Sequence, residues 1–262
     1  MEKDILLLSS ENQIHRLSLN RPQKCNALSA ELVQALSLAL EKAAKRAEIK
    51  AVLLCGEGKH FCAGADLLAM QKAAQDSWES NRAEAEKLAN LFYQMYTFPK
   101  PLIALAQGAT LGGGLGLLLC CDAVIATTQA SFCFSEAKIG LAPSIVSPYA
   151  LAALGERRTR YYFLSAQSFG AQKALDLGLI EAVVKEEDLE QAGMDLAQSI
   201  AKHSPGAVAE IKQLIISVKS KEISPSLAQE TAENLARIRA SKEGQEGLAA
   251  FLEKREPSWH GG

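Results

Sequence analysis

The chain has 262 residues, of which 28 are Lys or Arg and 30 are Asp or Glu, giving a formal net charge of −2. With 48% hydrophobic and 22% charged residues, it has the composition of a folded protein with a sizeable core and not of a disordered chain. The balanced charge argues against nucleic acid or an anionic membrane surface as the main partner.

The first half of the chain shows strand and helix patterns in alternation. Two short apolar runs at 5–9 and 14–20 predict a β-hairpin. Ser29 has the side chain of a helix N-cap and is followed by leucines at helical spacing, so a helix is expected from there to about Arg46. Apolar runs then predict buried strands at 51–55, 102–106 and 122–126. Strands that alternate with helices indicate an α/β fold.

After about Tyr149 the pattern becomes helical. Helical apolar spacing, with starter or breaker residues at the ends, predicts four helices at 186–203, 205–219, 225–241 and 242–256. We therefore expect an α/β core over 1–200 that carries the functional site, followed by a helical region over 201–262.

The cysteine spacing bears on whether the chain binds a metal, and one long uncharged stretch bears on whether it crosses a membrane. The six cysteines form no C-x-x-C pair and have no histidine pair at ligand spacing, so no metal site is expected. The amino-terminal segment resembles neither a signal nor a transit peptide, which predicts a cytoplasmic protein with reduced thiols. The uncharged stretch 101–121 is long enough to cross a bilayer. However, three consecutive glycines at 112–114 would break one continuous helix, so a strand, a glycine loop and a helix start are predicted, without a membrane partner.

Standard nucleotide and hydrolase motifs are missing from the sequence. Glycine pairs at 56/58 and 112/114 follow predicted strands, but Phe61 and Leu117 stand where a dinucleotide fingerprint needs its third glycine. There is no P-loop motif and no G-x-S-x-G elbow, and the four histidines are scattered. Rossmann, P-loop and Ser-His hydrolase interpretations are therefore not supported.

Two turns of small residues, at 55–66 and 106–115, each connect a predicted strand to a predicted helix. Ala and Gly let a ligand approach the backbone, and N–H groups at a helix start are free to donate. Two such groups that converge on one oxygen would form an oxyanion hole. The alternative is that both segments are tight turns that bind nothing.

Glu136 lies within the otherwise apolar segment 131–143. Burial would raise the pKa of its carboxyl toward the range in which a general acid or base works at neutral pH. It could equally be a helix-start glutamate or the ion-pair partner of Lys138.

Several segments together resemble the crotonase (enoyl-CoA hydratase/isomerase) superfamily. They are 20–28 (NRPQKCNAL), 61–66 (FCAGAD), the 112–114 glycines with 121–122, 169–180 (FGAQKALDLGLI) and 251–255 (FLEKR). The resemblance implies a ββα spiral core over 1–200 with an acyl-CoA site and a helical trimerisation region over 201–262. It also implies a homo-oligomer, either a trimer or a hexamer built as a dimer of trimers. Substrates would be acyl-CoA thioesters, with no metal or redox cofactor, since coenzyme A is part of the substrate.

The resemblance also assigns residues. Its two oxyanion-hole donors fall on the backbone N–H groups of Ala63 and Gly113, and a catalytic glutamate falls on Glu136. Positions that contact coenzyme A fall on Lys24, Ala27, Ala65, Asp66 and Leu67, and on Phe251 and Lys254, the last two often from a neighbouring subunit.

One position departs from the family pattern. Typical hydratases of the family carry two glutamates that face the substrate, and the first falls here on Gly116. A single glutamate is the arrangement of Δ3,Δ2-enoyl-CoA isomerases. The chain nevertheless looks most like the bacterial methylglutaconyl-CoA hydratase branch, whose substrate is branched and carries a carboxylate. The segments that carry this likeness are 115–117, 120–122, 135–136, 139–143 and 147–149.

We therefore predict an enoyl-CoA hydratase with Glu136 as the principal acid/base. The room opened at Gly116 is expected to admit a branched or dicarboxylic acyl group such as that of 3-methylglutaconyl-CoA. The basic residues at 157–160 could hold its carboxylate, although a solvated helix face or a phosphate contact is the simpler interpretation. The alternatives are an isomerase that uses one glutamate and a non-catalytic scaffold that binds acyl-CoA or RNA. The absence of a basic stripe and the presence of Glu136 argue against the scaffold.

Overall fold

The structure, a computed structural model, describes residues 4–260. Its main element is a six-stranded sheet in the order β1-β2-β3-β4-β6-β9. The strands are β1 (Leu6–Glu11), β2 (Ile14–Leu19), β3 (Ala51–Gly56), β4 (Leu102–Ala106), β6 (Ala123–Thr127) and β9 (Ala182–Val184). β1 pairs antiparallel with β2, which confirms the predicted hairpin, and all other neighbours are parallel. Every residue of β3 and β4 is buried, as the continuous apolar runs predict for parallel strands covered on both faces.

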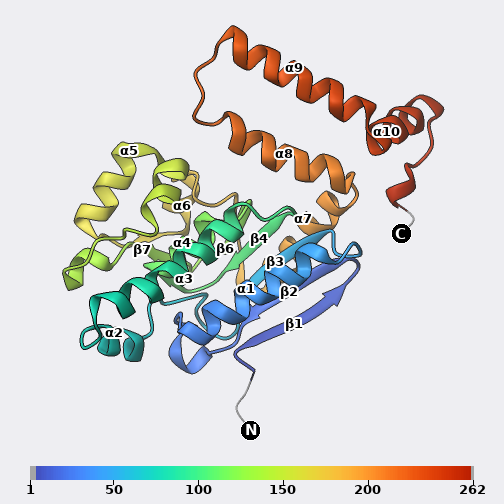
Figure 1. Cartoon of the computed structure of the whole chain (residues 1–262). Helices are drawn as coiled ribbons and strands as arrows, with labels where there is room; N and C mark the ends of the chain where they lie inside the picture. The colour runs from blue at the N-terminus through green and yellow to red at the C-terminus, as the bar shows by residue number, and fades with distance from the viewer. Residues whose placement is uncertain (1–3, 261–262) are drawn as a thin grey trace.

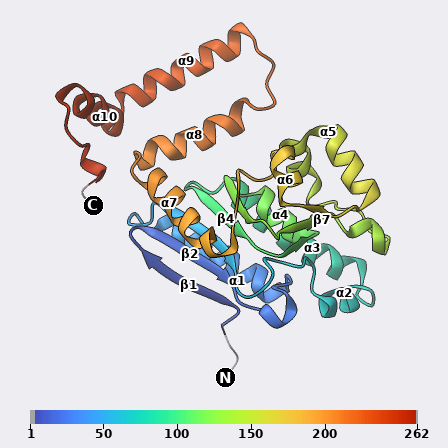
Figure 2. The same cartoon turned by 180° about the vertical axis from the view of Figure 1, so that it is seen from behind.

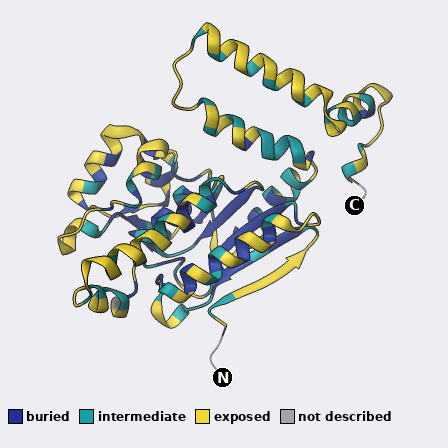
Figure 3. Ribbon diagram, in the orientation of Figure 1, coloured by how far each residue is buried: buried dark blue, intermediate teal, exposed yellow. Residues whose placement is uncertain are grey.

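Helices cover both faces of this sheet (Figures 1 and 2). α1 (Ala30–Lys45) and α3 (Trp78–Tyr96) lie on one face, and α7 (Leu189–Ala201) lies on the other. α1 begins as predicted, because the Ser29 side chain accepts a hydrogen bond from the Leu32 N–H. The sheet strands form the buried layer between these helices, while β1 at the edge remains largely exposed (Figure 3).

A second, three-stranded sheet brings the 106–115 and 131–143 segments together. It contains β5 (Ala109–Leu111), β7 (Ser131–Cys133) and β8 (Phe169–Gly170), with β7 in the middle. β5 leads through Gly112 into α4 (Gly113–Leu119), and β7 leads into the short 3-10 helix η2 (Glu136–Ile139). Because β5 and β7 are paired, the start of α4 and the start of η2 lie side by side.

The uncharged stretch 101–121 forms β4, β5 and α4, as the strand, loop and helix start predicted for it. Within residues 4–260, no helix is both long enough and apolar enough to cross a membrane.

The carboxy-terminal helices extend away from the core (Figures 1 and 2). They are α8 (Pro205–Val218), α9 (Pro225–Ala240) and α10 (Lys242–Glu253), close to the predicted ranges. Lys212 on α8 ties this region to the core, since its ammonium is paired with Asp122 and donates to the Lys100 carbonyl at 3.0 Å. α9 is exposed along most of its length (Figure 3).

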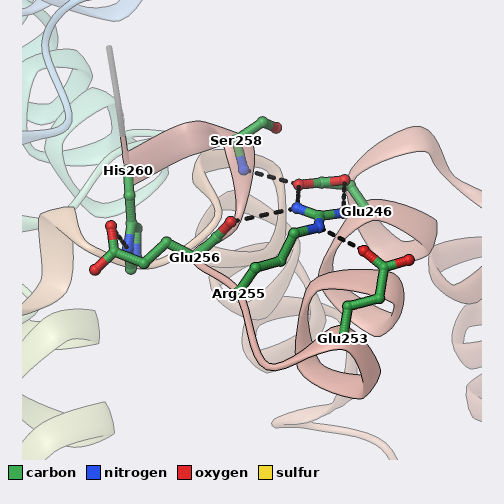
Figure 4. A network of polar contacts seen from close by, with 6 residues as sticks. All are labelled: Glu246, Glu253, Arg255, Glu256, Ser258 and His260. Carbon is green, nitrogen blue, oxygen red and sulfur yellow. Dashed lines mark hydrogen bonds and ion pairs between the residues drawn. The ribbon is translucent and has the colours of Figure 1, made fainter.

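The chain beyond α10 folds back on that helix through an arginine (Figure 4). The Arg255 guanidinium binds both carboxylate oxygens of Glu246, at 2.7 and 2.9 Å, and also contacts Glu253. The Ser258 N–H donates to the same Glu246 carboxylate. These charge-assisted contacts fix the path of the tail against α10.

Some elements differ from the sequence predictions. The helix predicted at 186–203 is a 3-10 turn, η3 (Glu186–Asp188), followed by α7, and the helical pattern expected after Tyr149 is interrupted by β8 and β9. These strands have two and three residues, too few to show alternation. The other helices are α2 (Leu67–Ala73), α5 (Ser147–Ser165) and α6 (Ala171–Leu177). α3 was not predicted, because only three of its residues are fully buried and its apolar stripe is narrow.

Candidate active site

A cleft of about 410 Å³ opens between α1, α2, α3 and the segment that joins η2 to α5. This volume lies within the range of small-molecule sites. Most of its lining is apolar, from residues such as Leu28, Met70, Leu88 and Val146. Gly113 and Glu136 also line it, so the start of α4 and the start of η2 both face the cleft.

The two small-residue turns meet at this cleft. The Leu111 N–H donates to the Cys62 carbonyl at 3.0 Å. A Cβ on Gly64 would lie 2.7 Å from the Leu111 oxygen and 3.5 Å from the Gly113 nitrogen. Gly64 also has a φ of +87°, a conformation that favours glycine. The turn after β3 therefore packs directly against the turn before α4, as an oxyanion hole built from both would require.

The first donor that the sequence analysis assigned is wrong. The Ala63 N–H is occupied, because it donates to the Cys25 carbonyl at 2.9 Å. The Asp66 N–H donates to the Leu28 carbonyl, and neighbouring N–H groups of an extended segment point in opposite directions, so the Ala65 N–H faces away from that loop. Ala65 lines the cleft, and its N–H has no hydrogen-bond partner in the described chain. The available donor in this turn is therefore Ala65.

Gly113 meets the requirements for the second donor. It is the first residue of α4, where the N–H has no partner within the helix. It lines the cleft together with Ala65, and nothing else in residues 4–260 accepts its hydrogen bond. Two free N–H groups, from Ala65 and Gly113, are thus present on one cleft.

A buried asparagine that the sequence analysis missed holds this arrangement. Asn26 is fully buried, and its amide donates to the carbonyls of Glu57 and His60 at 2.9 and 2.8 Å. Its side-chain oxygen accepts from the Arg21 N–H at 2.8 Å. The two bonds from its amide join the 21–28 loop to the turn after β3, and the bond from Arg21 holds the loop itself. A lone asparagine between small residues carries no sequence signal for this role.

The Glu136 carboxyl lies beside Gly112, the residue before Gly113. One of its oxygens, Oε1, would be 3.1 Å from a Cβ on Gly112. The other oxygen, Oε2, is buried and has no hydrogen-bond partner in the described residues. The Lys138 ammonium instead lies 3.6 Å from the Cys133 sulfur, so the ion pair with Glu136 is not formed. Glu136 does open a short helix, and Oε2 of its carboxyl stays unpaired within the described residues.

Burial raises the pKa of the Glu136 carboxyl above its ordinary value of 4.5. The neutral form is therefore favoured in the folded state, and ionisation costs stability as pH rises through the raised pKa. Glu136→Gln removes this cost. We expect the melting temperature of the variant minus that of the wild type to increase as pH rises from 4 to 8. A melting-temperature difference that stays constant over this range would show that ionisation of Glu136 is not disfavoured in the fold.

The expectation for Gly116 is wrong, because the room beside it is filled. A Cβ on Gly116 would lie 2.2 Å from Cε2 of Phe92, a fully buried ring on α3. That ring also packs edge-on against Tyr149, with centroids 6.0 Å apart. Gly116 is buried and does not line the cleft. The absence of a side chain there makes space for Phe92 and not for an acyl group.

This packing predicts that Gly116→Glu is strongly destabilising. Overpacking a core typically costs about 1–3 kcal/mol, and the unpaired buried carboxylate adds to that cost. The free energies of unfolding of Gly116→Glu, Phe92→Ala and the double variant form a cycle that isolates the clash. We expect the double variant to be more stable than the sum of the single effects predicts. Additive effects would mean that Phe92 does not occupy this space.

Four of the remaining assigned positions lie in the 21–28 loop or at the start of α2. Asp66 is buried, caps α2 at the Leu68 N–H (2.8 Å) and binds Arg21 (2.7 Å), so its carboxylate is already occupied. Ala27 is buried, with its carbonyl bound by Arg21, while Lys24 is exposed beside it. Leu67 begins α2, and its side chain lies outside the described part of the structure.

Phe251 and Lys254 are not brought to the cleft of their own chain. Phe251 lies on α10 and is 81% exposed, and Lys254 caps the carboxyl end of that helix. Both views show α10 at the opposite end of the molecule from α2 and α3 (Figures 1 and 2). A contact of these residues with substrate would have to be made in another subunit.

The family model described as enoyl-CoA hydratase/isomerase matches residues 9–262. The chain belongs to the enoyl-CoA hydratase/isomerase family. The chain is 32% identical to the 2,3-dehydroadipyl-CoA hydratase of Escherichia coli over 98% of both chains. It is 30% identical to the short-chain-enoyl-CoA hydratase of Clostridium acetobutylicum over 97% of both.

The solved structures agree with this assignment. An enoyl-CoA hydratase from Shewanella pealeana superposes with a TM-score of 0.95 at 40% identity, covering 98% of this chain and 97% of that one. An enoyl-CoA hydratase/isomerase (crotonase) from Legionella pneumophila gives a TM-score of 0.92 at 41% identity, covering 97% and 98%. The predicted crotonase-like α/β fold is therefore confirmed. The chain is a member of an enzymatic family that acts on acyl-CoA thioesters.

Proposed function

We propose that the protein is an enoyl-CoA hydratase that adds water across the 2,3 double bond of an acyl-CoA thioester. The observation that supports it most directly is the meeting of three groups on one cleft: the free N–H groups of Ala65 and Gly113 and the Glu136 carboxyl, whose Oε2 has no hydrogen-bond partner in the described residues. Two donors and one carboxyl are the groups needed to stabilise an enolate and move its protons.

The chemical step follows from bond polarity. The two N–H groups bind the thioester oxygen, on which negative charge develops when water attacks C3 and the double bond breaks. The neutral Glu136 carboxyl gives its proton to C2, and its other oxygen takes a proton from the attacking water. The product carries the new hydrogen on C2 and the hydroxyl on C3, and Glu136 is protonated again. Burial raises the pKa of the Glu136 carboxyl and so favours the neutral form that this step needs.

The proposal that the substrate carries a carboxylate on its acyl chain rests on a lysine of the cleft and not on the arginines at 157–160. Arg158 donates to the Leu177 carbonyl at 3.0 Å and Arg160 pairs with Glu156, both on α5 and away from the cleft lining. Lys87 on α3 lines the cleft and has no ion-pair partner in the described chain. We propose a dicarboxylic or branched enoyl-CoA such as 3-methylglutaconyl-CoA as substrate, in line with the dehydroadipyl-CoA named for the relative from E. coli.

The quaternary structure and the cellular location are part of the same proposal. Large apolar side chains on the carboxy-terminal helices are exposed, including Ile215, Phe251 and Leu252. Exposed apolar surface of this kind is typical of subunit interfaces. We propose that the 201–262 region forms a homotrimer, alone or as half of a hexamer, in the cytoplasm.

A second candidate is a Δ3,Δ2-enoyl-CoA isomerase. The observation that favours it is the missing second glutamate of the family pattern: that position is Gly116, and Phe92 fills the space beside it. In that reaction Glu136 would carry one proton between C4 and C2.

Absorbance of the conjugated thioester distinguishes the candidates. Purified protein is incubated with crotonyl-CoA, a 3-enoyl-CoA and 3-methylglutaconyl-CoA. A hydratase lowers the absorbance of the first and third, with the larger kcat/KM on 3-methylglutaconyl-CoA. An increase with the 3-enoyl-CoA and no change with the other two would identify the isomerase. Binding without any turnover would identify a scaffold.

A further inference from the structure

Hydration requires a group that holds the attacking water, and this inference rests on the proposed hydratase function. Phe92 fills the space beside Gly116, so no side chain from that position reaches the water. In the proposed step, both oxygens of Glu136 handle protons. A water held by Glu136 alone would be free to rotate about that single hydrogen bond, which leaves its lone pair without a fixed direction.

The residue before Glu136, Ser135, carries a hydroxyl on the same side of Gly112 as the Glu136 carboxyl. Ser135 Oγ would lie 3.5 Å from a Cβ on Gly112, and Glu136 Oε1 would lie 3.1 Å from the same point. The two oxygens therefore flank the backbone that leads to the Gly113 donor. Ser135 is half-buried, and its hydroxyl has no hydrogen-bond partner in residues 4–260.

The serines that line the cleft are already used. Ser29 Oγ accepts from the Leu32 N–H at 3.3 Å, and Ser144 Oγ donates to the Ala142 carbonyl at 3.4 Å. Ser135 is not among the residues that line the cleft, and it differs from both in having a free hydroxyl that shares the side of Gly112 with the Glu136 carboxyl.

We infer that Ser135 positions the attacking water. The water donates one hydrogen bond to Glu136 and the other to Ser135 Oγ, which leaves a lone pair of its oxygen directed at C3. No bond to Ser135 forms or breaks, and the proton of the water goes to Glu136 as described above.

Variants of Ser135 test this role. Ser135→Ala is expected to fold, because its hydroxyl satisfies no other group, and to lower kcat for crotonyl-CoA hydration about tenfold, the effect of one lost hydrogen bond. KM should change little. Ser135→Thr keeps a hydroxyl and should retain most of the rate.

A second measurement separates water positioning from an effect on Glu136. Exchange of the C2 hydrogens of butyryl-CoA in D₂O, followed by NMR, needs Glu136 and the two N–H donors but no attacking water. Ser135→Ala should exchange at the wild-type rate. Exchange that falls in parallel with hydration, or hydration that is unaffected, would overturn the inference. Wild-type protein that hydrates no enoyl-CoA would overturn the proposed function itself, before any variant is compared, and the water site with it.

Discussion

Glu136→Gln is expected to reduce hydration of crotonyl-CoA by roughly 10²–10⁴-fold, the usual contribution of a general acid or base. An effect near the upper end is expected because the second glutamate of the family pattern is absent: its position is Gly116, and Phe92 takes the space beside it. Glutamine has nearly the same shape as glutamate but cannot give up a proton, so kcat should fall while the affinity for a saturated CoA ester is kept. The measurement is kcat by absorbance together with the Kd of butyryl-CoA by calorimetry.

The interpretation of this variant depends on what else changes. A variant that keeps a tenth of the wild-type kcat would show that Glu136 is not the proton-transfer group. Loss of butyryl-CoA binding in parallel with kcat would mean that the substitution disturbs the cleft itself.

Gly113→Pro is expected to lower kcat about 10²–10³-fold, because it removes one oxyanion donor, a loss typically worth about 2.7–4 kcal/mol. Proline has no backbone N–H, yet it is well tolerated at the first position of a helix, which Gly113 occupies in α4. The helix should therefore form without the donor. Steady-state kinetics on crotonyl-CoA give the change in kcat, and circular dichroism checks the fold.

Gly113→Ala is the matched control for the proline variant. Its N–H remains, and its Cβ would lie 3.2 Å from Cδ1 of Leu28, the flexible end of a side chain that can move slightly. We expect it to retain far more activity than the proline variant. Equal losses in the two variants would show that bulk, and not the missing N–H, is responsible.

Local chemistry made much of the fold predictable. The parallel strands β3 and β4 are continuous apolar runs, and the helix α1 starts at a serine that caps it. Glu136 stood out because it is a carboxyl in an apolar segment, and its raised pKa follows from the burial that this pattern implies.

Two features of the site depend on long-range contacts and were predicted wrongly. Which N–H of the 63–65 turn is free depends on its pairing with the 25–28 loop, which occupies Ala63 and leaves Ala65. Whether Gly116 opens a space depends on α3, a helix whose weak pattern was missed and which places Phe92 there. Neither contact can be predicted from the residues next to it in sequence.

The pH dependence of kcat for crotonyl-CoA hydration by the wild-type protein tests the central claim, that one neutral carboxyl performs both proton transfers. The account predicts a constant kcat in the acid range and a fall of about tenfold per pH unit above the pKa of Glu136, which burial places above 4.5. A kcat that rises with pH through the acid range would require an ionised Glu136 and would contradict the mechanism.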